Sequence, residues 1–141
     1  MKPWVKYLVY ISLLVLIAFL GSYIARTIEA NDHYPVLINT LWIVFYGAMG
    51  LILGSEHLLR ELKKDGIWKI NLPKIIVMGV PSLYISLSSL IYYNYFINTF
   101  LPSLVFPIRV MLRGNFDFLN IFQLLLGYII STSFYKYNNA L

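Results

Sequence analysis

The chain has 141 residues, of which 60% are hydrophobic and only 12% are charged, and its mean hydropathy is +0.72. Soluble domains average roughly 25% charged residues, and disordered chains combine low hydrophobicity with high net charge. The composition fits neither class, and it therefore predicts an integral membrane protein with one transmembrane domain over residues 1–141. The net charge of +5 comes from cations that lie between apolar runs, which argues against a nucleic-acid-binding face, and the absence of cysteine excludes disulfides and thiolate metal sites.

Four apolar runs are long enough to cross a membrane as helices, because about 20 residues span a hydrocarbon core of ~30 Å. They cover residues 5–24, 36–54, 75–96 and 118–134. Apart from Lys6 at the edge of the first, they contain no charged side chain and no histidine. Their apolar residues are continuous rather than alternating, which disfavours a β-barrel. We therefore predict an all-α integral membrane protein with four transmembrane helices in an antiparallel bundle.

The first run carries Lys2 before it and Lys6 at its edge, and it imitates a secretory signal peptide. Cleavage requires small residues near the end of such a segment, and Tyr23 occupies one of those positions. We therefore expect residues 5–24 to be retained as the first membrane helix.

The cations are distributed unequally between the two sides that these four crossings would define. One side would hold eight, namely Lys2, Lys6, Arg60, Lys63, Lys64, Lys69, Lys74 and Lys136. The other would hold three, namely Arg26, Arg109 and Arg113. The positive-inside rule then places both termini and the loop 55–74 in the cytoplasm, as in a multi-pass protein of the cell (plasma) membrane.

Two connections have patterns of their own. The loop 55–74 begins with leucines on one face and charges on the others, which predicts a helical extension of the second span, ended by Gly66. The segment 97–117 is too apolar for a solvated loop and is interrupted by Pro102 and Pro107, which predicts an interfacial or re-entrant element on the outer face. The cations expected to contact lipid head groups are Arg109, Arg113, Lys63 and Lys64.

At about 100° per residue, small and polar side chains fall on shared faces of the second, third and fourth spans. The residues that would line a cleft between those spans are Asn39, Tyr46, Ser82, Ser86, Ser89, Tyr93 and Gln123. The glycines expected at helix contacts are Gly50, Gly54 and Gly127, the first two in a GxxxG pattern. Two interpretations stay open: these faces only pack helix against helix, or they enclose a polar cleft that takes a ligand or a lipid head group.

One ionisable cluster, Glu56, His57, Arg60 and Glu61, contains residue types that can serve catalysis or metal binding. His57 and Glu61 are four residues apart on a helix, but the cluster lacks a HExxH motif and a third ligand. A helix-surface ion pair between Glu56 and Arg60 explains the same residues more simply. We expect no catalytic residue, no metal and no cofactor, and we expect Pro81 to give the third span a static kink.

The absence of charge from the centre of the spans favours a non-enzymatic assembly, regulatory or lipid-interacting component, because ionisable groups within a membrane normally mark transport or catalytic paths. Its expected partner is the lipid bilayer, together with a second copy of the chain or another membrane protein, and not nucleic acid. One alternative is a small transporter or channel with a polar cleft between helices 2, 3 and 4; another is a membrane-embedded enzyme acting on lipid. High usage of Ile, Leu, Tyr, Asn and Lys is typical of proteins from AT-rich bacterial genomes.

Overall fold

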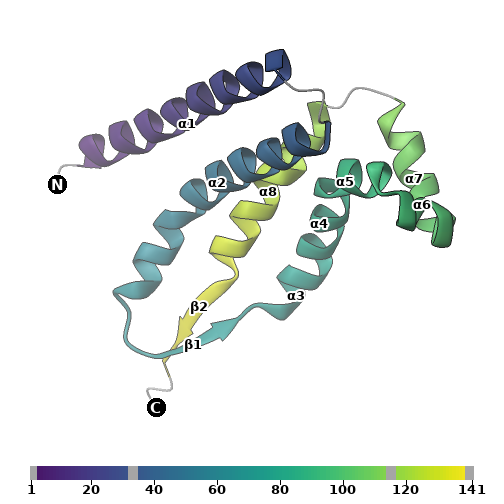
Figure 1. Ribbon diagram of the computed structural model, residues 1–141. Coiled ribbons are helices and arrows are strands. Elements are labelled where there is room, and N and C mark those ends of the chain that lie inside the picture. The colour runs from purple at the N-terminus through teal and green to yellow at the C-terminus, as the bar shows by residue number, and fades with distance from the viewer. Residues whose placement is uncertain (1–2, 32–34, 114–116, 139–141) are drawn as a thin grey trace.

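The computed structural model describes residues 3–31, 35–113 and 117–138, and it is mostly helical (85%), which confirms the predicted helical class (Figure 1). The elements are α1 (Pro3–Asn31), α2 (Pro35–Leu62), β1 (Ile67–Ile70), α3 (Leu72–Lys74), the π-helical turn η1 (Ile75–Gly79), α4 (Val80–Ser86), α5 (Ser88–Tyr93), α6 (Tyr95–Phe100), α7 (Pro102–Leu112), α8 (Asp117–Thr132) and β2 (Phe134–Tyr137).

Within the residues that the structure describes, two helices are long and apolar enough to cross a membrane. They cover Trp4–Ile28 in α1 and Val36–Leu62 in α2, and only 11% and 6% of their most apolar stretches are buried. The core helix of a soluble protein would be mostly buried, so these helices present their apolar side chains outward. The predicted extension of the second span is confirmed, since α2 continues past Gly54 to Leu62.

The main helix–helix interface lies between α2 and α8 (Figure 1). At Gly50 the backbone of α2 lies against the carbonyl group of Leu124, and at Gly127 the backbone of α8 lies against the carbonyl group of Gly47. Gly54 lies equally close to the side chain of Ser131. A methyl group at any of these three glycines would overlap its neighbour, so small residues are what let the two backbones approach.

The third predicted span is not one continuous helix, and this corrects the prediction for residues 75–96. The helical segment breaks at Leu87, whose φ of −88° and ψ of 0° leave the α region, and ends at Asn94, whose ψ is 110°. The Asn94 side chain accepts a hydrogen bond from Ile97 N at 3.2 Å. Asparagine caps helix starts in this way, and here it begins α6 where the prediction continued the previous helix.

Pro81 is accommodated by the π-helical turn that precedes it. Because proline has no N–H and its ring collides with the carbonyl group four residues earlier, it disturbs regular α-helix. Here the Val80 N–H bonds Ile75 O, five residues back, and widens the helix just before the proline.

A two-stranded antiparallel sheet, which the sequence did not predict, joins the loop after α2 to the C-terminal segment. Ile67 pairs with Tyr137, and Ile70 pairs with Phe134. Gly66 precedes β1 with φ +142°, a conformation that side-chain-bearing residues rarely adopt. The fourth predicted span therefore ends two residues early, at Thr132, and gives way to β2.

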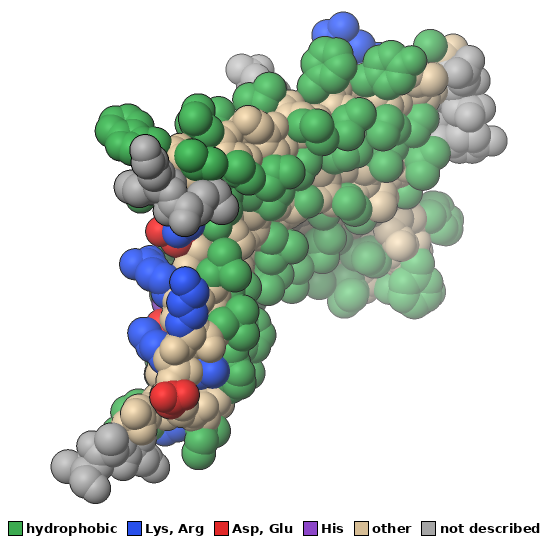
Figure 2. All heavy atoms as spheres, turned by 90° about the vertical axis from the view of Figure 1, so that its left-hand side faces the viewer, with side chains coloured by type: hydrophobic (Ala, Val, Ile, Leu, Met, Phe, Trp, Pro, Cys, Tyr) green, Lys and Arg blue, Asp and Glu red, His purple; other side chains and the backbone are tan. Residues whose placement is uncertain are grey.

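The described residues show an inverted distribution of polarity. The buried apolar residues are Ala25, Val105, Ile108, Leu119 and Ile129. The buried polar residues are more numerous: Glu61, Ser82, Ser86, Ser88, Ser89, Gln123, Ser131 and Ser133. Large apolar side chains point outward instead, and Figure 2 shows them covering the helices, with charged side chains gathered along one edge.

Candidate functional site

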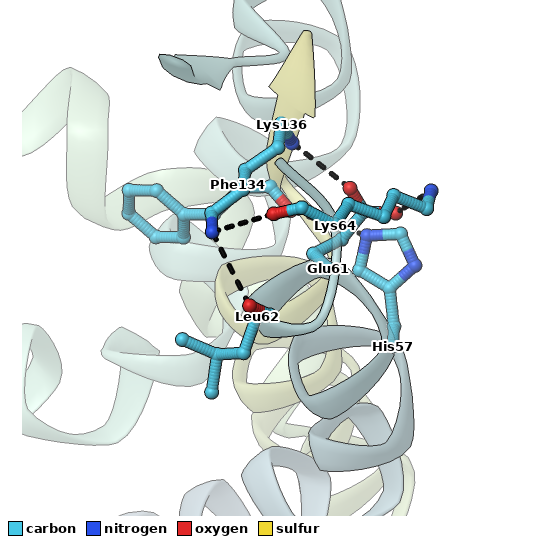
Figure 3. Close-up of polar contacts among 6 residues, drawn as sticks. All are labelled: His57, Glu61, Leu62, Lys64, Phe134 and Lys136. Carbon is cyan, nitrogen blue, oxygen red and sulfur yellow. Dashed lines mark hydrogen bonds and ion pairs between the residues drawn. The ribbon is translucent and has the colours of Figure 1, made fainter. Parts of the chain in front are cut away.

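Charged and aromatic side chains gather where α2 ends and the two strands pair. Glu61 lies in the last turn of α2, beside Lys64 and Lys136 (Figure 3). Its carboxylate is buried, and only 5% of this residue is exposed. Its Oε2 accepts a hydrogen bond from the backbone N–H of Lys136 at 2.9 Å, and its Oε1 accepts one from Lys64 Nζ. Glu61 therefore ties β2 to the end of α2.

Lys136 completes this attachment with its side chain. Its Nζ donates to the carbonyl oxygens of Leu62 at 3.2 Å and Lys64 at 2.7 Å (Figure 3). The last carbonyl groups of a helix lack partners within the helix and carry partial negative charge. A lysine ammonium at this position satisfies these carbonyl groups and stabilises the end of α2.

His57 is used in the same attachment. Its Nε2 lies 3.1 Å from Phe134 O (Figure 3). A carbonyl oxygen only accepts, so Nε2 is the protonated ring nitrogen in this contact. His57 thus joins α2 to the first residue of β2.

The ionisable cluster is held by contacts that the sequence did not predict. Glu56 pairs with Lys6 of α1 at 3.0 Å, and not with Arg60 as expected. Among the described residues, no group of three His, Cys, Asp or Glu side chains could hold a metal ion. The structure therefore assigns Glu56, His57 and Glu61 to contacts between elements.

The surface beside this attachment is basic and aromatic, and we call it the basic ribbon. It consists of Lys63, Lys64, Ile67, Trp68, Lys69, Leu72, Lys136 and Tyr137. Two of its lysines lie over aromatic rings, Lys69 Nζ at 4.1 Å from the centre of Tyr137 and Lys136 Nζ at 5.3 Å from that of Trp68. These separations fall within the roughly 6 Å of a cation–π contact. Of the ribbon's cations, only Lys63 and Lys64 were expected to contact head groups.

The predicted cleft residues do not all meet in one place. Tyr46 lines a hollow between α1 and α2, with its ring 5.7 Å from that of Trp42. Tyr93 lines a different hollow, between α5 and α7. Asn39 is half-buried in the first turns of α2.

The remaining cleft candidates are buried on α4, α5 and α8, where α4 packs against α8 and α5 packs against α2 and α7. They are Ser82, Ser86, Ser89 and Gln123. Ser88, which the helical spacing did not select, is buried as well, because the break at Leu87 changes which side chains turn inward. Among the described residues, no hydrogen-bond partner reaches Ser86 Oγ, Ser88 Oγ or Gln123 Oε1. Most buried side-chain oxygens in folded proteins have a hydrogen-bond partner, so these three are exceptions among the packed helices.

The two remaining head-group candidates, Arg109 and Arg113, lie on and just after α7, away from the basic ribbon. Both are exposed, and Arg109 Nη2 donates to Asn98 Oδ1 at 3.2 Å. The structure therefore places these two arginines and the basic ribbon in separate groups.

Comparisons with known proteins add no assignment to this geometry. No protein-family model, curated protein or solved structure matches the chain.

Proposed function

We propose that the chain is a multi-pass membrane protein that crosses the bilayer four times, with the third crossing made of several short helices. The inverted distribution of polarity carries this proposal. In water, apolar side chains move inward and polar ones outward. An interior rich in glycine and serine, with a few apolar side chains such as Ile108 and Ile129, beneath an exterior of Leu, Ile, Val and Phe suits hydrocarbon solvent. There, close packing and hydrogen bonds hold helices together.

Contacts between distant segments support the proposed sidedness. Lys6, near the start of α1, pairs with Glu56 near the end of α2, and β1 pairs with β2. Each contact requires its two segments to lie on the same side of a membrane. The N-terminal segment, the loop after α2 and the C-terminal segment thus belong together, and they carry most of the cations, which favours the cytoplasmic side.

We further propose that the basic ribbon holds anionic lipids at that face and that the protein acts without catalysis, as a lipid-interacting or assembly component. Lys63 and Lys69 are exposed, and Ile67 and Leu72 beside them are 70% and 60% exposed. Apolar side chains next to lysines suit the boundary between acyl chains and head groups, where each cation contributes about 1 kcal/mol of attraction to an anionic leaflet.

The experiment compares Lys63→Gln/Lys69→Gln with the charge-conserving control Lys63→Arg/Lys69→Arg. Each protein is placed in nanodiscs of mixed phosphatidylglycerol and phosphatidylcholine, and retained lipid is counted by native mass spectrometry. Loss of two cations near the surface corresponds to about 2 kcal/mol, so the glutamine variant should retain distinctly less phosphatidylglycerol. Equal retention by both variants would refute lipid binding by the basic ribbon.

A further inference from the structure

A second group of polar side chains surrounds a hollow between α5 and α7. The hollow has a volume of about 310 Å³ and is lined by Tyr92, Tyr93, Arg109, Leu112 and Arg113. Small-molecule sites have volumes of roughly 300–1,000 Å³, so this hollow can take a compact group. None of its five lining residues is acidic, and two are arginines.

The positions of the two arginines suit one ligand. Arg109 lies near the end of α7 and Arg113 directly follows its last residue, and both line the hollow. Among the described residues, neither arginine is paired with a carboxylate. A guanidinium group can donate two parallel hydrogen bonds to phosphate oxygens. Two arginines that pair with no described carboxylate and line one hollow therefore favour a phosphate ester with one or two negative charges.

Asn98 gives this arrangement a fixed support. Its Oδ1 accepts from Arg109 Nη2 at 3.2 Å, while its Nδ2 donates to the carbonyl oxygens of Tyr92 at 2.6 Å and Asn94 at 2.9 Å. The backbone at the end of α5 therefore orients the amide through its nitrogen. The amide oxygen is left to hold the guanidinium group of Arg109. The helix is interrupted at Asn94, and this change of direction brings α6, and with it Asn98, against α7.

The walls of the hollow provide further suitable groups. The rings of Tyr92 and Tyr93 lie edge to face with their centres 5.4 Å apart, and each residue is about two-fifths exposed, at 40% and 44%. Phenolic hydroxyls can donate to phosphate oxygens, and Leu112 adds an apolar surface. Beside the hollow, Phe106 and Val110 of α7 are 68% and 56% exposed, which suits contact with hydrocarbon.

We propose that this hollow binds a phosphate ester, with Arg109 and Arg113 as the binding residues and Asn98 as a positioning residue. The phosphate belongs either to the head group of an anionic lipid or to a small soluble ester. This site is separate from the basic ribbon, and the proposal does not depend on lipid binding there.

The test uses the full chain and three variants: Arg109→Gln/Arg113→Gln, the charge-conserving Arg109→Lys/Arg113→Lys, and the control Arg26→Gln, which removes an exposed arginine of α1. Two probes are applied to each protein: phosphatidylglycerol retained in mixed phosphatidylglycerol–phosphatidylcholine nanodiscs, counted by native mass spectrometry, and glycerol 3-phosphate binding measured by calorimetry. Circular dichroism and size-exclusion elution identify any variant that fails to fold, and the lysine variant then serves in its place.

We expect the glutamine variant to weaken binding of one probe by at least about tenfold, the effect of losing about 1.4 kcal/mol. The lysine variant should show an intermediate loss, because lysine keeps the charge without the two-pronged geometry, and Arg26→Gln should bind as the original chain does. Loss of lipid retention alone identifies a lipid head group, and loss of glycerol 3-phosphate binding alone identifies a soluble ester. If the folded arginine variants bind both probes as tightly as the original chain, the proposal is wrong. Lipid binding by the basic ribbon is tested by other variants, at Lys63 and Lys69. A negative result for the arginine variants therefore leaves that proposal standing.

Discussion

At Gly127 and Gly50 the contact surface between α8 and α2 is the peptide backbone itself. Each glycine faces a carbonyl group of the opposite helix at a separation that leaves no room for a side chain. The neighbouring Gly47 differs, because a Cβ there would meet no atom within 4 Å. Spacing along the sequence identified Gly50, Gly54 and Gly127 as helix-contact candidates, but it could not identify their partners, since that depends on which helices are neighbours.

Gly127→Ala should destabilise the protein, and Gly47→Ala provides a matched control on the other side of the same contact. The new methyl group at Gly127 must push the helices apart, and overpacking of this kind costs about 1–3 kcal/mol. At Gly47 the added methyl has space and raises helix propensity by up to about 1 kcal/mol. Thermal unfolding in detergent, followed by circular dichroism, should show a lower midpoint for Gly127→Ala alone. Equal midpoints for the two variants would contradict the described α2–α8 contact.

At the scale of elements, the end of α2 and the strand β2 are joined by the carboxylate of Glu61. The sequence placed Glu61 correctly on a helical extension but could not show what it contacts, because β2 is distant along the chain. The same limit applied to Glu56, for which the nearby Arg60 was the obvious partner and Lys6 of α1 is the observed one. Local spacing predicts contacts within a helix, whereas contacts between elements depend on how the chain folds.

Glu61→Ala should loosen β2 while leaving α2 intact. The Lys136 N–H and the Lys64 ammonium both lose their acceptor, and hydrogen bonds to a charged group contribute about 1.5–3 kcal/mol. Hydrogen exchange monitored by mass spectrometry should therefore speed up in residues 134–137 by about tenfold or more. Glu56→Gln, which alters the pair with Lys6 instead, is the control. Unchanged exchange in β2 after Glu61→Ala would show that the strand is held by other contacts.

At the scale of the whole molecule, apolar run length located the starts of α1 and α2 and both ends of α8 to within two residues. The helices α1 and α2 continue past the ends of their apolar runs, to Asn31 and Leu62. Run length failed for residues 75–96, where Pro81, four serines and Asn94 lie within an otherwise apolar run. The average hydropathy of the run hides these residues. Serine and asparagine side chains can hydrogen-bond to the backbone in place of the helical partner, and proline lacks the N–H that a regular helix uses. The β1–β2 sheet was missed for a different reason: each strand is four residues long and pairs with a segment that is distant along the chain.

The proposed sidedness is tested most directly by labelling single cysteines. The chain contains no cysteine, so Lys69→Cys, Thr99→Cys and Asn138→Cys each introduce one thiol at an exposed position. Intact cells are treated with a membrane-impermeant maleimide, and lysed cells serve as the control for reactivity. We predict that Thr99→Cys is labelled in intact cells, and that Lys69→Cys and Asn138→Cys are labelled only after lysis. Labelling of Lys69→Cys or Asn138→Cys from outside, or of all three positions alike, would contradict a four-crossing protein with the basic ribbon on the cytoplasmic side.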